Sequence, residues 1–149
     1  MPLWKGRMSE QCGALMTKTV VIDTNVIVRY LLNDNAQQNA IATQYLDNSE
    51  ITCVLPVMTF CEIDWVLRKK IKIPRLDVIS FFERLTKKSN VVFEKPLFEI
   101  GLYFLKNGGD FADGVIAYQT THFDNAKWLT FDKDGRKLAK RVGIGLEIE

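Results

Sequence analysis

The sequence predicts an α/β fold, in which a central parallel sheet of four to five strands is covered on both faces by helices in a three-layer arrangement. Short β-branched and apolar runs alternate along the chain with longer segments whose apolar residues recur at helical spacing. The first of these runs is apolar on both faces, which is typical of a strand buried in a parallel sheet. With 149 residues, 47% hydrophobic and 26% charged, the chain has the size and composition of one globular domain rather than of a disordered or fibrous protein.

The first half of the chain predicts two strands and three helices. Residues 19–23 form the first strand, and residues 24–32 follow with apolar positions on one helical face. The polar triplet at 33–35 ends that helix and caps a second one, which reaches about residue 47. A short strand at 51–54 precedes a long helix, which Pro56 opens and which extends to about residue 70.

The second half continues the alternation, with helices opened by proline or aspartate and a helix stop at Gly108-Gly109. The predicted elements are, in order, a helix from Pro74 to about Lys88, a strand at 91–93, a helix at 96–106, a helix from Asp110 to about Phe123, a fourth strand at 127–131, a short basic helix and an edge strand at 142–148.

The N-terminal residues 1–17 are predicted to be an extension that is disordered or outside the fold, so that the domain spans residues 18–149. This extension has no apolar stretch of the kind that signal peptides carry, and no stretch of the chain is long enough to cross a bilayer. Three cysteines without a CxxC pair favour a reduced compartment. We therefore expect a cytoplasmic protein without a membrane partner.

Positive charge is concentrated in two segments although the net charge is only +2. One lies at 68–88, and the other at 133–141 directly follows an acidic residue. Basic segments beside an acidic centre suit a polyanionic substrate, and Arg68, Lys69 and Lys72 are the candidate substrate-binding residues. Solvated helix faces explain either segment equally well.

Four widely spaced acidic residues are the candidate catalytic and metal-binding groups: Asp23, Glu62, Asp113 and Asp132. Asp23 and Asp132 end predicted strands, and in open α/β sheets the carboxyl ends of the strands line the ligand crevice. Carboxylates gathered there repel one another unless a cation lies between them. Hard oxygen ligands without a nearby His or Cys indicate Mg²⁺ or Mn²⁺. Such ions activate water and stabilise charge in phosphodiester hydrolysis.

Each of these acids also has a purely structural interpretation. Asp23 and Asp132 are placed to cap the helices that follow them, and Asp113 is a favourable charge at a helix N-terminus. Glu62 fits a solvated helix position. Any one of these interpretations is reasonable, but the specific sequence contexts make all four together the weaker hypothesis.

Those contexts resemble a known family. The segments at 21–27, 60–63, 110–113 and 129–132 are similar to the signature segments of PIN-domain ribonucleases, and within them to the VapC-type toxins of toxin–antitoxin pairs. The resemblance covers about residue 18 to the C-terminus. It implies a Rossmann-like sheet, Mg²⁺ or Mn²⁺ dependence, endoribonuclease activity, a homodimer, and a cognate antitoxin protein as partner.

Carried over by position, the resemblance assigns the four acids to the catalytic quartet. Thr24, Asn25 and Thr130 match the polar positions that orient those carboxylates, and Asp110 matches a position that is often acidic. Gly114 departs from the pattern, because relatives more usually carry Ala there, and it is expected to loosen its helix.

The sequence is also compatible with other functions. A haloacid-dehalogenase-type phosphatase needs a second Asp where this chain has Asn25. A PIN-like RNA-binding or scaffold protein without catalysis usually lacks one of the four acids. A DNA-directed nuclease is not excluded, since nothing in the sequence reads a 2′-hydroxyl. An apolar surplus on the helices at 56–88 supports the homodimer; it consists of Trp65, Val66, Ile71, Ile73, Phe81 and Phe82.

Overall fold

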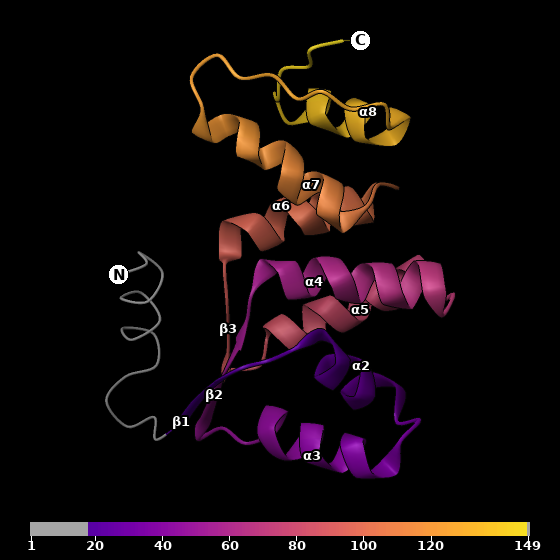
Figure 1. Cartoon of the computed structure of the whole chain (residues 1–149), viewed down its shortest axis with the longest axis vertical. Coiled ribbons are helices and arrows are strands. Elements are labelled where there is room, and N and C mark those ends of the chain that lie inside the picture. Colours follow the sequence, from indigo (N-terminus) through magenta and orange to yellow (C-terminus); the bar gives the residue numbers. More distant parts are fainter. Residues whose placement is uncertain (1–17, 149) are drawn as a thin grey trace. The chain divides into compact units, whose positions relative to one another are not determined.

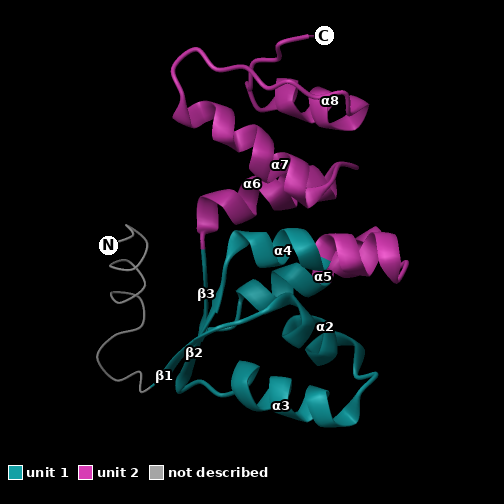
Figure 2. Ribbon diagram, viewed as in Figure 1, with its two compact units in different colours: residues 1–63, 81–93 teal, residues 64–80, 94–149 magenta. Residues whose placement is uncertain are grey.

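The computed structural model describes residues 18–148, so the predicted N-terminal extension lies outside the described residues. These residues divide into two units, which Figure 2 distinguishes by colour. Unit 1 comprises residues 18–63 and 81–93, and unit 2 comprises residues 64–80 and 94–148. No helix within the described part is long and apolar enough to cross a membrane.

Unit 1 contains a parallel three-stranded sheet in the order β1-β2-β3 (Figure 1). Its strands are β1 (Lys18–Val21), β2 (Ile51–Leu55) and β3 (Val91–Phe93). Residues 52–55 of the central strand are all buried, which explains why its sequence is apolar without alternation. The sheet confirms the predicted α/β class.

The helices of unit 1 begin and end close to the predicted positions. They are α2 (Thr24–Leu32), α3 (Ala36–Leu46), α4 (Val57–Asp64) and the second half of α5 (Arg75–Thr86). Asn33 ends α2 in the left-handed conformation at φ 51°, and the side chain of Asn35 caps α3 by accepting from the backbone N–H of Gln38 at 3.0 Å. The polar triplet thus performs both predicted roles.

Aromatic side chains hold the core of unit 1. The ring of Phe60 on α4 lies edge-on to Phe82 and Phe93, at centroid distances of 5.3 and 6.3 Å. Phe81 and Phe82 are 5% and 0% exposed, so these two residues belong to the core and not to an apolar surplus. Of the six residues counted as surplus, Trp65 and Ile71 are the exposed ones, at 58% and 40%.

Unit 2 consists mainly of helices. It holds the first half of α5 together with η1 (Trp65–Lys70), α6 (Lys95–Lys106), α7 (Phe111–Tyr118), η2 (Gln119–His122) and α8 (Lys133–Arg141). The single helix predicted from Asp110 to Phe123 is therefore an α-helix followed by a 3₁₀ turn. The segment η1 continues α4 as a π-helix, with wider turns than the predicted α-helix.

The predicted fourth strand and edge strand meet in one parallel bridge between Trp128 and Leu146, so the sheet within residues 18–148 has three strands rather than four to five. The backbone N–H of Trp128 donates to Gly145 at 2.8 Å, and that of Glu147 donates to Trp128 at 3.1 Å. Leu129 and Phe131 are 61% and 84% exposed. The apolar run 127–131 is therefore buried only through Trp128.

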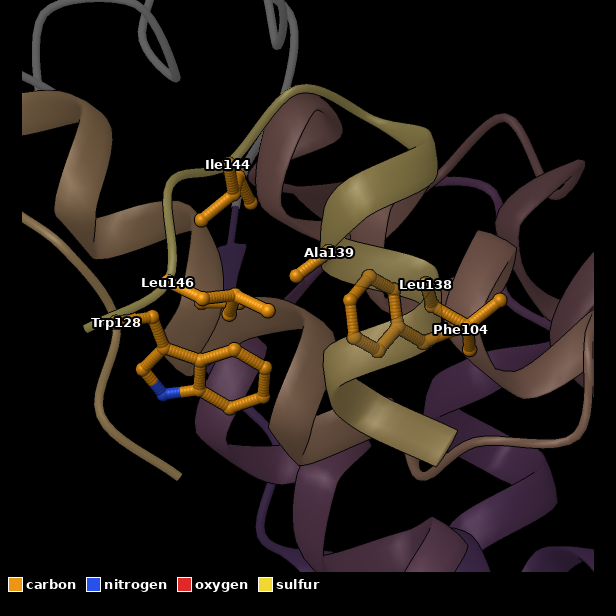
Figure 3. Close-up of a cluster of buried hydrophobic side chains, with 7 residues drawn as sticks. Phe104, Trp128, Leu138, Ala139, Ile144 and Leu146 are labelled. Atoms are coloured by element: carbon orange, nitrogen blue, oxygen red, sulfur yellow. The ribbon is translucent and has the colours of Figure 1, made fainter. Parts of the chain in front are cut away.

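Trp128 and Leu146 belong to the hydrophobic core of unit 2 (Figure 3). Phe104 of α6 and Leu138 of α8 contribute to the same cluster, and both are almost completely buried. The chain after α7 is thus fixed by apolar burial, which explains why two nearly unpaired segments lie next to each other.

Helices α6 and α7 approach closely because a glycine on each helix removes a side chain from their contact. A Cβ at Gly101 would lie 2.6 Å from the ring of Phe111, and a Cβ at Gly114 would lie 2.7 Å from the carbonyl oxygen of Ile100. Gly114 thus also has a packing role that its sequence context does not reveal, because this glycine allows the two helices to approach closely.

We expect Gly114→Ala to lower the free energy of unfolding by about 1–3 kcal/mol, because the new methyl group overlaps a backbone oxygen that has no room to move. The higher helix propensity of Ala offsets at most about 1 kcal/mol of this loss. Urea denaturation measures the change. Gly145→Ala is the matched control, since its Cβ would meet nothing nearer than 3.6 Å. A Gly114→Ala protein as stable as wild type would contradict the packing assigned to this glycine.

Candidate functional site

Asp23 lies directly beyond β1, at the carboxyl end of an edge strand of the sheet. The backbone N–H of Ile22 still bonds to the carbonyl of Val54 at 2.9 Å, so the pairing with β2 holds the chain in place up to this point. Asp23 is the N-cap residue of α2, but its side chain makes no capping hydrogen bond and is exposed. Helix capping therefore does not account for the carboxylate of Asp23.

The second acid of unit 1, Glu62, is held by a threonine. The hydroxyl of Thr24, which is only 5% exposed, donates to Oε2 of Glu62 at 3.0 Å. The hydroxyl of Thr59 donates to the carbonyl of Ile22 at 3.4 Å, which ties α4 to the end of β1. The first turn of α2 and the middle of α4 are thus brought together, while Asn25 lies exposed beside them.

Asp113 lies in the first turn of α7 and is half-buried. Burial, together with the negative charges of Asp110 and Asp132, raises the pKa of Asp113 to about 6, and the positive charge of Lys69 acts weakly in the opposite direction. Unit 2 therefore places the carboxylates of Asp110 and Asp132 close enough to Asp113 to act on its pKa, although Asp132 is 19 residues away in the sequence.

Asp132 caps α8, as the structural interpretation of its sequence predicts. Its Oδ2 accepts from the backbone N–H of Gly135 at 2.6 Å, and its own N–H donates to the hydroxyl of Thr130 at 3.2 Å. A Cβ at Gly135 would lie 2.8 Å from Oδ2 and 2.9 Å from the Trp128 ring, so only glycine fits there. The cap fixes the carboxylate through Oδ2, and Oδ1 takes no part in it.

Asp110 forms part of a partly buried ion-pair network that the sequence patterns do not predict. Nη2 of Arg68 donates to Oδ1 of Asp110 at 2.6 Å, and Arg68 is also paired with Asp64, which is 2% exposed. Burial acts to raise the pKa of Asp110, but the hydrogen bond from Arg68 and the nearby positive charges outweigh it, so that this pKa is lowered. The (i, i+4) spacing of Asp64 and Arg68 is the signal in the sequence that could have revealed the pair.

The three candidate substrate-binding residues differ in accessibility. The side chain of Arg68 is 7% exposed and bonded to carboxylates, whereas that of Lys69 is 52% exposed, with Nζ 3.8 Å from Asp110. Lys72 is exposed on a left-handed turn at φ 71°. Only the two lysines present a cation to solvent.

The donor set fits a hard divalent cation. All four candidate ligands are carboxylates, and a bound cation would offset both the burial and the neighbouring negative charges that raise the pKa of Asp113. No three His, Cys, Asp or Glu side chains within residues 18–148 are gathered tightly enough to hold a metal ion by themselves. Unit 1 contributes Asp23 and Glu62 to the candidate set, and unit 2 contributes Asp113 and Asp132.

A comparison with known protein families agrees with this set of candidate residues. The model of the PIN domain family matches residues 20–141, which is most of the chain and includes all four acids. Neither the curated proteins nor the solved structures gave a match.

The raised pKa of Asp113 predicts how metal-free stability depends on pH. Below its ordinary value of 3.8 the carboxyl is protonated in both the folded and the unfolded state, and it contributes nothing. As the pH rises from there to about 6, the folded state retains a proton that the unfolded state has lost, so this group lowers stability, fully so above about pH 6.

We therefore expect Asp113→Asn to raise the melting temperature in EDTA at about pH 7.5, with little effect near pH 4. Calorimetry across this range measures it. Asp124→Asn, at an exposed position of the same unit, is the control and should follow wild type. Equal melting temperatures of wild type and Asp113→Asn at every pH would show that burial and the neighbouring acids do not destabilise the ionised Asp113.

Proposed function

Because this chain belongs to the PIN domain family, we propose that it is a Mg²⁺- or Mn²⁺-dependent endoribonuclease, a hydrolase that cleaves RNA phosphodiester bonds. PIN domains are generally nucleases, and this much follows from the family alone. The metal dependence, the RNA specificity and the biological role form the proposal.

The observation that carries the proposal is the environment of Asp113. Unit 2 half-buries this carboxylate and surrounds it with the charges of Asp110 and Asp132. A purely structural aspartate at a helix N-terminus gains from the helix dipole and does not need two further acids beside it. An arrangement that lowers stability and is nevertheless built into the fold is typical of a functional site.

We assign the metal to Asp23, Glu62, Asp113 and Asp132. When bound, the ion supplies a water activated near neutral pH and positive charge for the phosphoryl oxygens. The residues around the acids restrict how they move. Thr24 fixes one oxygen of Glu62, and Gly135 fixes one oxygen of Asp132, so that neither carboxylate has to be ordered when the substrate arrives.

We propose that the exposed basic side chains contact the substrate. Lys69 and Lys72 are available to phosphate groups, and the helix α8, which directly follows Asp132, adds five basic residues. These are Lys133, Arg136, Lys137, Lys140 and Arg141. A polyanion bound by these residues would run beside Asp113 and Asp132 of the same unit.

The expected products carry a 5′-phosphate and a 3′-hydroxyl. Cleavage without metal through a 2′,3′-cyclic phosphate commonly needs two groups that exchange protons, for which a histidine pair is the usual choice. The chain has one histidine, His122, which is exposed and packs edge-on to Tyr118 at a centroid distance of 5.3 Å. Hydrolysis by water that releases the ribose 3′-oxygen is the better fit to this set of residues.

Two alternative functions share the same fold. A PIN-like RNA-binding or scaffold protein without catalysis would bind RNA and leave it intact, and the presence of all four acids speaks against it. A DNA-directed nuclease would use the same acids, and a pair of RNA and DNA substrates of equal sequence distinguishes it.

The biological role that we propose is that of a toxin paired with a cognate antitoxin protein in the cytoplasm. The support is the resemblance of the four acidic segments to VapC-type toxins. A small upstream gene that encodes a DNA-binding head with a polar or acidic tail would support this role. Expression of the chain without harm to its host, in the absence of that gene, would count against it.

We also propose a homodimer. Its support is three large apolar residues of unit 2 that are exposed to solvent, Trp65, Ile71 and Leu76, at 58%, 40% and 77%. Sedimentation equilibrium tests the proposal, and a mass of 17.1 kDa at all concentrations up to about tens of micromolar would refute it.

Cleavage of RNA by the purified protein tests the proposed activity. We expect cleavage in Mn²⁺ or Mg²⁺, no cleavage in EDTA, and 5′-phosphate ends on the products. Asp113→Asn should lose detectable cleavage and remain folded, whereas the control Asp124→Asn should cleave as wild type does. Full activity in EDTA, or 2′,3′-cyclic phosphate ends, would refute the mechanism, and metal-independent binding without cleavage would favour the scaffold alternative.

A further inference from the structure

Arg68 and Asp64 form the most deeply buried ion pair of the described residues. Nε of Arg68 donates to Oδ1 of Asp64 at 2.5 Å, and Nη2 donates to Oδ2 at 2.9 Å, so the contact is bidentate. The two side chains are 7% and 3% exposed. Such a pair costs desolvation energy, and losing one partner leaves a buried charge uncompensated.

The same pair completes the N-terminus of α7. Oδ2 of Asp64 accepts from the buried backbone N–H of Phe111 at 3.1 Å. The N-cap residue Asp110 makes no capping bond of its own, and its Oδ1 instead accepts from Nη2 of Arg68 at 2.6 Å. A carboxylate 47 residues earlier in the chain thus caps the helix, and the guanidinium holds both acids in place.

The local backbone around Arg68 is unusual as well. In η1 the N–H of Ile71 bonds to the carbonyl of Val66 at 2.9 Å, a π-type bond that widens the helix. Single π turns are frequent at functional sites, where they redirect a side chain. Here the widened turn contains the residue that reaches the N-terminus of α7.

We propose that Arg68 is a positioning residue, which together with Asp64 fixes the first turn of α7 and thereby the carboxylate of Asp113, and that it is not a contact for the substrate. The inference rests on the proposed function of that carboxylate. Asp113 is two residues beyond Phe111 on the same helical turn, so any shift of the capped N–H moves it. Arg68 would have to abandon two carboxylates to reach a phosphate, whereas its neighbour Lys69 already faces solvent.

The test is Arg68→Lys, which keeps the positive charge but loses the planar two-point contact. If Arg68 positions Asp113, this variant lowers kcat and the affinity for Mn²⁺, each by about 10–100-fold. KM and the salt dependence of RNA binding, measured without cleavage in Ca²⁺, stay close to wild type. If Arg68 instead binds phosphate as a point charge, kcat is retained and any loss falls on KM.

Two variants calibrate these readings. Lys69→Met removes an exposed charge next to Arg68, and it should raise KM, retain kcat and reduce the slope of log affinity against log salt by about one contact. Lys95→Met removes a charge that is 75% exposed on α6 of the same unit, and all parameters should remain those of wild type. Wild-type kcat and Mn²⁺ affinity in Arg68→Lys would overturn the proposal.

A local measurement separates positioning from general destabilisation. Amide hydrogen exchange of Arg68→Lys should be faster at Phe111 by about tenfold, with unchanged protection at Leu138 in the core of unit 2. Equal acceleration at both amides would refute a local role. If Arg68→Lys does not fold, Asp64→Asn provides the comparison. The amide oxygen of the new side chain can still accept from the N–H of Phe111, but the side chain no longer carries a negative charge to pair with Arg68.

The positioning role of Arg68 can be tested even if the wild-type protein does not cleave RNA. The proposed function would then be wrong, whereas Mn²⁺ affinity and the exchange of Phe111 would still decide whether Arg68 positions Asp113. Conversely, wild-type cleavage together with an unaffected Arg68→Lys variant would refute only the positioning role.

Discussion

The cost of holding a half-buried carboxylate beside two others is the constraint on which the arrangement around the first turn of α7 depends. Asp113 is held half-buried beside the charges of Asp110 and Asp132, and the result is a carboxyl group whose pKa rises to about 6. Such an arrangement persists only if surrounding contacts oppose the relaxation that would separate the charges. The buried Arg68 neutralises part of the cluster, and its hydrogen bonds to Asp64 and Asp110 keep the N-terminus of α7 from moving away.

Small residues make the same arrangement sterically possible. Gly101 accommodates the ring of Phe111 and Gly114 accommodates the backbone of α6, so that α6 and α7 pack closely and the axis of the helix that carries Asp113 is fixed. Gly135 lets the first turn of α8 approach both Asp132 and Trp128. Electrostatic positioning and close packing therefore act together, because hydrogen bonds hold a carboxylate in place only if van der Waals contacts hold the backbone that carries it.

The sequence predicts well what depends on local patterns. The three strands and most helix ends of unit 1 follow from apolar runs and capping residues such as Asn33 and Asn35. The sequence predicts a strand at 127–131, where the structure has only one bridge. Apolar composition alone does not show that Leu129 and Phe131 are exposed while Trp128 is buried. A single buried indole can hold a segment that forms only one bridge, and periodicity does not report this.

The candidate site likewise combines features that local sequence patterns predict with features that depend on tertiary contacts. The sequence contexts single out the four acids as candidates, but they do not reveal the network of Asp64, Arg68 and Phe111, because it joins residues up to 47 positions apart through one side chain. Arg68 looked like its neighbours Lys69 and Lys72 in a basic segment. Its burial distinguishes it from them, and burial of an arginine is decided by the tertiary partners that it finds.

The structural interpretation of the acids turns out to be compatible with the functional one. Asp23 and Asp132 are N-cap residues of α2 and α8, and Asp113 lies in the first turn of α7. The partial positive charge of a helix N-terminus offsets some of the cost of holding an anion there. Glu62 lies in the interior of α4 without this benefit, and it is the acid that receives a hydrogen bond from a buried hydroxyl, that of Thr24. Each acid of the quartet thus has a local source of positive potential. Placement at a helix N-terminus is therefore one of the means by which this fold offsets the cost of holding carboxylates where a cation can bind them.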